Sequence, residues 1–121
     1  MIAGRISACV AACVFLAAAC SDVSFVDEVT IVNDTEYPAD VEVTGRARDR
    51  WLGLTVVTQR STATVDGVID QGEMWIFRFH YTGRYEELEI SRNELERNDW
   101  TIEVPQSFEQ RLRDLGVPPP P

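Results

Sequence analysis

The sequence predicts a mainly β protein: a small antiparallel β-sandwich of immunoglobulin-like architecture with one or two short C-terminal helices. From Phe25 onward, short segments rich in Val, Ile, Thr and aromatic residues alternate with polar residues at a period of two. Turn residues separate these segments about every eight to twelve positions, which is typical of sandwiches. The Cys-Trp-Cys pattern of true immunoglobulin domains is absent. The likeness is therefore one of architecture, and a small open barrel is the alternative.

The first half of the domain is predicted to contain four strands separated by polar turns and one charged loop. The strands are expected at residues 26–33, 41–44, 51–59 and 62–65. Between the first two lies the turn segment 33–38, and residues 46–50 form the charged loop. Asp66-Gly67 is a hairpin-type dipeptide and predicts a turn before Val68-Ile69.

The clearest local prediction is a hairpin in which residues 74–81 and 84–90 flank the two-residue loop Thr82-Gly83. Alternation along its strands predicts an apolar inner face made of Trp75, Phe77, Phe79, Leu88 and Ile90. The outer face is predicted to carry the cross-strand pairs Arg78–Glu87 and His80–Tyr85.

The C-terminal part predicts two short helices around a last strand. Ser91 and Glu94 have the spacing of a capping box, which predicts a helix over residues 92–97. Residues 100–104 alternate as a strand that ends at a proline. Residues 107–115 carry Phe108, Leu112 and Leu115 at helical spacing, with Gly116 as the stop residue.

The N-terminal segment has the order of a secretory signal. One arginine lies in residues 1–5, residues 6–19 are apolar apart from one serine, and small residues precede Cys20. The run Leu16-Ala17-Ala18-Ala19-Cys20-Ser21 resembles the lipobox of bacterial lipoproteins. That resemblance implies a diacylglyceryl group on the Cys20 thiol and cleavage before Cys20. The expected location is then the cell membrane, on its extracytoplasmic face.

Alternative processing sites lie in the same segment. Val10-Ala11-Ala12-Cys13 also fits the box locally, and Ala17 with Ala19 would suit an ordinary signal peptidase, giving a secreted protein. The expected organisation is a signal peptide at 1–19, the lipidated cysteine and a short tether at 20–24, one domain at 25–116 and a Pro-rich tail at 117–121. The tail is expected to be a frayed terminus, with an extended ligand for an aromatic groove as the alternative.

Charge and cysteine content limit the function classes. All three cysteines lie within residues 1–20, so residues 21–121 hold no pair that could form a disulfide. Arginine is the only basic side chain present besides the single histidine, which fits a high-GC bacterial source. The chain has a net charge of −9 at pH 7. Such a surface repels nucleic acid and anionic headgroups, so direct binding to either is not expected.

Few residues suggest chemistry, and no catalytic residue or cofactor is predicted. His80, the single histidine, is expected on a strand surface, and no zinc or serine-nucleophile motif accompanies it. Asp66, Asp70 and Glu73 form a weak candidate cation site, with solvated turn residues as the alternative.

The tryptophans suggest one candidate binding loop. Trp75 and Trp100 are in phase with the core, which leaves Trp51 as the surface candidate. It follows three arginines at alternate positions, and guanidinium groups bind carboxylates or phosphates at two points. The predicted ligand-binding loop is therefore Arg46, Arg48, Arg50 and Trp51, with an ordinary charged connection as the alternative.

Together these observations predict a membrane-anchored, non-enzymatic binding or accessory module of the cell envelope, held by a lipid at Cys20 and contacting an envelope protein. An enzyme or inhibitor of unrecognised type, and a weak cation-dependent module, are the alternatives.

Overall fold

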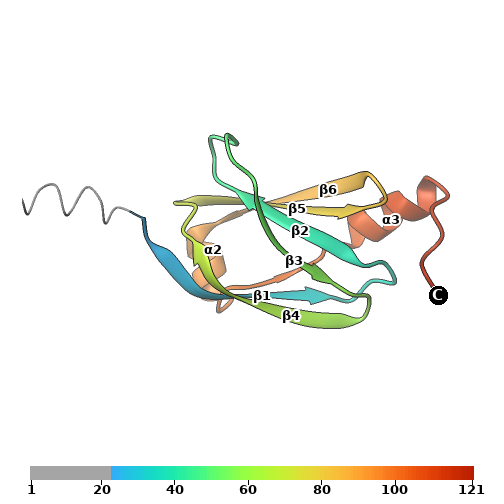
Figure 1. The fold of residues 1–121 in the computed structure, drawn as a ribbon, viewed down its shortest axis with the longest axis horizontal. Coiled ribbons are helices and arrows are strands. Elements are labelled where there is room, and N and C mark those ends of the chain that lie inside the picture. Colours follow the sequence, from blue (N-terminus) through green and yellow to red (C-terminus); the bar gives the residue numbers. More distant parts are fainter. Residues whose placement is uncertain (1–22) are drawn as a thin grey trace, which may run out of the picture.

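Figure 1 shows the computed structural model of the chain, which describes residues 23–121. The predicted signal segment and Cys20 lie outside the described residues. The described part contains seven strands and two helices, in the order β1 (Phe25–Asn33), β2 (Ala39–Thr44), β3 (Leu52–Val57), β4 (Ser61–Ile69), β5 (Met74–Tyr81), β6 (Arg84–Ser91), α2 (Arg92–Arg97), β7 (Thr101–Glu103) and α3 (Gln106–Asp114).

The strands form two sheets, which confirms the small β-sandwich. One sheet has three strands in the order β4-β1-β7, and the other has four in the order β3-β2-β5-β6 (Figure 1). Neighbouring strands are antiparallel except for the parallel pair β1 and β7. This exception arises because α2 turns the chain around at the end of β6, so β7 leaves from the end of the sandwich where β1 begins.

The β5–β6 hairpin has the predicted register and provides the largest core side chains. Residues Thr82 and Gly83 have φ angles of 48° and 78°, the left-handed geometry of a tight two-residue turn. The predicted inner face is confirmed, since four of its side chains are buried and Leu88 is partly buried against them. The four buried residues are Trp75, Phe77, Phe79 and Ile90.

The predicted turn at Asp66-Gly67 is wrong. Strand β4 runs through both residues and pairs with β1, placing Asp66 opposite Glu28 and Val68 opposite Val26. The chain reverses direction before β4, between β3 and β4, where Arg60 has a φ of 56°. Long-range pairing with β1 therefore outweighs the local turn preference of Asp-Gly.

Both predicted helices form: α2 has the expected bounds, and α3 begins and ends one residue earlier than expected. The Ser91 hydroxyl accepts a hydrogen bond from the Glu94 amide at 3.2 Å, capping α2. After α3, Gly116 has a φ of 75° and the Val117 amide donates to the Leu112 carbonyl at 2.9 Å. Val117, which the sequence assigned to the tail, packs against the core and accepts a hydrogen bond from the Tyr37 hydroxyl at 2.6 Å.

A buried polar corner closes the end of the sandwich where β1 ends, far from its first residue. The Asn33 side chain, 1% exposed, donates to the carbonyls of Tyr37 at 2.8 Å and Val57 at 3.0 Å. Its Oδ1 accepts from the amide and hydroxyl of Thr35 at 3.0 and 2.7 Å. The β1–β2 turn is thus tied to the end of β3 by a side chain with satisfied donors and acceptors.

Candidate functional site

The outer face of the four-stranded sheet holds a connected group of polar and aromatic side chains. Alternation along the strands turns Glu42 of β2, Arg78 and His80 of β5, and Tyr85 and Glu87 of β6 away from the core. Cross-strand pairing sets Glu42 opposite Arg78 and Arg78 opposite Glu87. With Arg48 and Trp51 from the β2–β3 loop, these seven residues are called the outer face below.

The β2–β3 loop folds back over one end of this face. The Thr44 hydroxyl donates to the carbonyl of Arg50, holding the two ends of the loop together. Arg48 donates to Glu87 at 2.9 Å and to Glu89 at 3.2 Å, bridging from the loop to β6. Ile76 is only 2% exposed although its neighbours Trp75 and Phe77 point into the core, so its outward side is covered as well.

The guanidinium of Arg78 lies between two aromatic rings at the centre of the outer face. Its central carbon lies 3.8 Å from the centre of the Trp51 ring and 4.6 Å from that of Tyr85. Arg78 also donates to one oxygen of Glu87, from Nε at 3.1 Å and from Nη2 at 2.8 Å. A planar guanidinium suits this place because it stacks and forms hydrogen bonds at the same time.

Glu87 links the two arginines and its charge is stabilised by them. The hydrogen bond from Arg48 is the largest cause that lowers the pKa of the Glu87 carboxyl from 4.5; partial burial opposes it, and the bond from Arg78 adds to it. The same contact raises the pKa of Arg48. The outer face therefore presents paired charges fixed in position, and Tyr85 is the most exposed aromatic residue of this face, at 44%.

His80 lies on the outer face, as predicted for a strand-surface histidine. Its Nε2 is hydrogen-bonded to Oε1 of Glu42, and its ring centre lies 5.7 Å from that of Tyr85. Within residues 23–121 no serine or threonine hydroxyl is hydrogen-bonded to His80. These contacts hold His80 on the surface of the sheet, between Glu42 and Tyr85.

The structure divides the predicted binding loop into two parts. Arg48 and Trp51 lie on the outer face, engaged with Glu87 and Arg78. Arg46 and Arg50 are exposed, and neither forms an ion pair with another described residue. The structure therefore brings Arg48 and Trp51 together on the outer face and leaves Arg46 and Arg50 in solvent.

The structure does not bring Asp66, Asp70 and Glu73 together. Asp70 forms an ion pair with Arg92 and accepts from the Gly72 amide at 2.8 Å. Burial is the largest single influence on the Asp70 carboxyl and opposes ionisation, but its hydrogen bonds outweigh it and lower the pKa. Asp66 lies on β4 beside an acidic hollow with Asp27 and Glu28. In the described part of the chain, no three His, Cys, Asp or Glu residues are placed to hold a metal ion.

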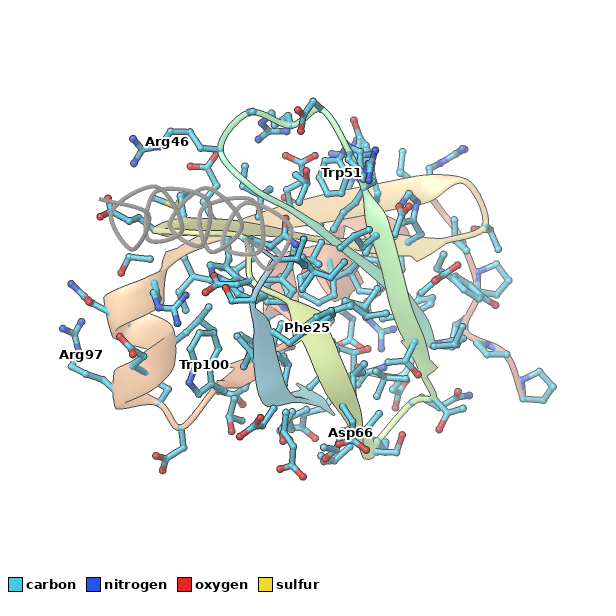
Figure 2. The ribbon with its side chains drawn as sticks, turned by 60° about the vertical axis from the view of Figure 1, so that its left-hand side comes forward. Phe25, Arg46, Trp51, Asp66, Arg97 and Trp100 are labelled. Atoms are coloured by element: carbon cyan, nitrogen blue, oxygen red, sulfur yellow. The ribbon has the colours of Figure 1, made fainter. Side chains whose placement is uncertain are left out.

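The predictions for the tryptophans are confirmed in outline. Trp75 is buried and donates from Nε1 to the Gly72 carbonyl at 3.0 Å. Trp100 packs edge-on against Trp75 with ring centres 5.3 Å apart and remains partly exposed. Figure 2 shows Trp51 at the opposite side of the view from Asp66.

The chain was compared with protein-family models, curated proteins and solved structures. No protein-family model, curated protein or solved structure matches it. Over residues 23–121, no helix has the length and apolar character needed to cross a membrane. The class that the structure defines is a two-sheet β-sandwich domain with a polar and aromatic face on its larger sheet.

Sequence patterns indicated parts of this face but not the whole. The hairpin register predicted the pairs Arg78–Glu87 and His80–Tyr85, and both are present. Glu42 was missed because its partner lies on β5, a neighbour that sequence order does not identify. The position of Trp51 over Arg78 depends on how the loop folds back, and the only signal was an aromatic beside a charged segment.

Proposed function

We propose that the chain is a lipid-anchored extracytoplasmic lipoprotein and that its domain is a non-enzymatic binding or accessory module of the cell envelope. In this proposal Cys20 carries the lipid and the outer face contacts a protein partner. The observation that supports the binding role best is the stack of Trp51, Arg78 and Tyr85. Tryptophan, tyrosine and arginine are the side chains that most often dominate protein interfaces.

The fixed geometry supports the same role. Arg78 is held by two rings and a carboxylate before any partner arrives, so little side-chain entropy is lost on association. Tyr85 offers an exposed ring beside these paired charges. A partner that supplies an apolar or aromatic residue against Tyr85 would bury it without leaving Glu87 unpaired.

Site-specific cross-linking in the cell tests the binding face. A photo-reactive phenylalanine analogue replaces Tyr85 in one strain and the exposed Thr62 of β4 in a control strain. We expect a discrete cross-linked product from position 85 and none from position 62. Adding Arg78→Ala should abolish the product, and Arg78→Lys should reduce it because lysine cannot stack and form both hydrogen bonds. Equal products from positions 85 and 62 would contradict the proposal.

Cell fractionation tests the anchor. Cys20→Ala should move the protein from the membrane fraction to the soluble fraction, because one lipid-modified residue provides the hydrophobic attachment. Cys13→Ala is the matched control and should leave the protein in the membrane fraction. The opposite pattern would place the lipid at Cys13, and membrane association of both variants would count against lipidation.

A further inference from the structure

Exposed apolar side chains gather at the end of the sandwich where β1 begins. The structure has six exposed large hydrophobic residues in its described part, and three are here: Val23 at 59%, Phe25 at 60% and Ile69 at 38% exposure. Phe25 and Ile69 are cross-strand partners on β1 and β4. Val23 and Ile69 also line one hollow with Arg50. These four residues are called the anchor-side end below.

Charge distinguishes this end from the remainder of the domain. Residues 23–121 contain ten arginines and nineteen acidic residues, yet the loop 45–51 holds two arginines, Arg46 and Arg50, that form no ion pair with another described residue. Arg92 pairs with Asp70, so the acid that follows Ile69 is neutralised. Exposed Arg46 and Arg50 balance Asp49 and Glu73. The charged residues that line the two hollows beside Ile69 and Glu73 are three arginines and three acids, so this side of the anchor-side end has no net charge. The acidic hollow with Asp27, Glu28 and Asp66 begins further along β1.

The length of the tether brings this end to the membrane. Val23 follows Cys20 by three residues, which span at most about 10 Å when extended. The domain must therefore present some surface to the bilayer, and an acidic surface would be repelled by anionic headgroups. Figure 2, which brings this end forward, shows Phe25 near the middle of the view and Arg46 toward its margin.

We propose that the anchor-side end rests on the lipid surface, with Phe25 and Ile69 in the headgroup region and Arg50 facing lipid phosphates. This inference rests on the proposed lipid anchor at Cys20. It fixes the orientation of the domain, because the long axis of the sandwich then points away from the bilayer and the outer face stays open to a partner.

Spin labels on the lipidated full chain test the orientation. Because lipid occupies the Cys20 thiol in the processed protein, an added cysteine is its free thiol for labelling. One label replaces Glu73, beside the anchor-side end, and the control label replaces Glu103 on β7; both remove one exposed acid. The protein is reconstituted in vesicles of phosphatidylethanolamine and phosphatidylglycerol. We expect a loss of accessibility to a water-soluble nickel complex at position 73 and none at position 103.

Two further measurements separate the possible failures. Adding Phe25→Ser and Ile69→Ser should restore nickel accessibility at position 73 while the protein still floats with the vesicles. Equal accessibility at positions 73 and 103 in floating protein would overturn the orientation but leave the anchor intact. Protection at position 73 that survives both serine substitutions would overturn the role of the apolar residues. Failure of the protein to float with the vesicles would contradict the proposed lipid anchor at Cys20, and the orientation would then have no basis.

Discussion

Glu87 is the residue that connects the outer face, since both Arg48 and Arg78 donate to it. Its contacts join the β2–β3 loop, β5 and β6 through one carboxylate. Removing its charge should therefore loosen the loop as well as the sheet surface.

Glu87 predicts a specific dependence of stability on pH. Its pKa is lower in the folded protein than the ordinary value of 4.5, so the ionised form stabilises the folded state at pH values above that value. This contribution is lost as the pH falls through the lowered pKa. Glu87→Gln should reduce the free energy of unfolding by about 1 kcal/mol near neutral pH, and the difference from the parent should shrink in acid. Urea unfolding followed by tryptophan fluorescence, at neutral and at acid pH, measures the free energy of unfolding of the parent and of the variant.

Glu103→Gln provides the comparison for Glu87. Glu103 is exposed and forms no ion pair with another described residue. Its substitution should leave the free energy of unfolding nearly unchanged, and the small difference from the parent should not decrease further in acid. A difference for Glu87→Gln that stayed constant with pH would contradict the role given to its charge.

Asn33 predicts a larger loss from a single side chain. Its amide donates to the Val57 carbonyl and its Oδ1 accepts from the Thr35 amide in a buried corner. Asn33→Ala would remove both contacts, whereas the Tyr37 carbonyl would keep the Thr35 hydroxyl as a donor. We expect a loss of roughly 2 to 3 kcal/mol in the free energy of unfolding. Asp34→Ala, at the neighbouring exposed position, should cost less than about 1 kcal/mol because its ion pair with Arg60 lies in solvent. Similar losses from both variants would refute this assignment.

At the scale of elements, α3 closes the sandwich near the C-terminus. Phe108 and Leu112 are fully buried on its inward side, and Phe108 lies 6.3 Å from Phe79 between ring centres. Glu109 and Arg113 fasten the helix to the β1–β2 turn, since Glu109 accepts from the Glu36 amide at 2.9 Å. The helix is therefore part of the core.

Leu112→Ala tests the contribution of α3. The substitution creates a cavity under the helix and should lower the free energy of unfolding by about 2 to 5 kcal/mol. Arg111→Ala, next in the chain and exposed, should change it by less than about 0.5 kcal/mol. Chemical denaturation of the two variants measures the contrast, and a small effect of Leu112→Ala would mean that α3 docks only weakly.

At the scale of the whole molecule, strand position predicts where the backbone is most protected. Strands β1, β2 and β5 have neighbours on both sides, whereas β3, β4, β6 and β7 are edge strands. Hydrogen exchange should therefore be slowest in β1, β2 and β5. Mass spectrometry of exchanged peptides can measure this order. Slower exchange in β4 than in β1 would contradict the strand order of the three-stranded sheet.

Much of the fold could be predicted from the sequence because its signals are local. The Thr82-Gly83 turn fixed the hairpin register, and Ser91 with Glu94 fixed the start of α2. The same local reasoning failed at Asp66-Gly67, where pairing with β1 decides the conformation. The parallel β1–β7 pair could not be predicted either, because its two strands lie about seventy residues apart in the sequence.

The candidate site likewise has one part that local sequence signals predict and another that only tertiary packing determines. By itself, the sequence determined the strand-rich class, the inward aromatic residues of the hairpin and the outward pairs of Arg78 and His80, because alternation and turn chemistry depend on neighbours in the chain. Only the tertiary structure decided that Trp51 stacks on Arg78, that Glu42 meets His80 and that Phe25 and Ile69 share one end. These contacts join residues distant in sequence, so the packing of the sheets and the folding back of the loop determine them.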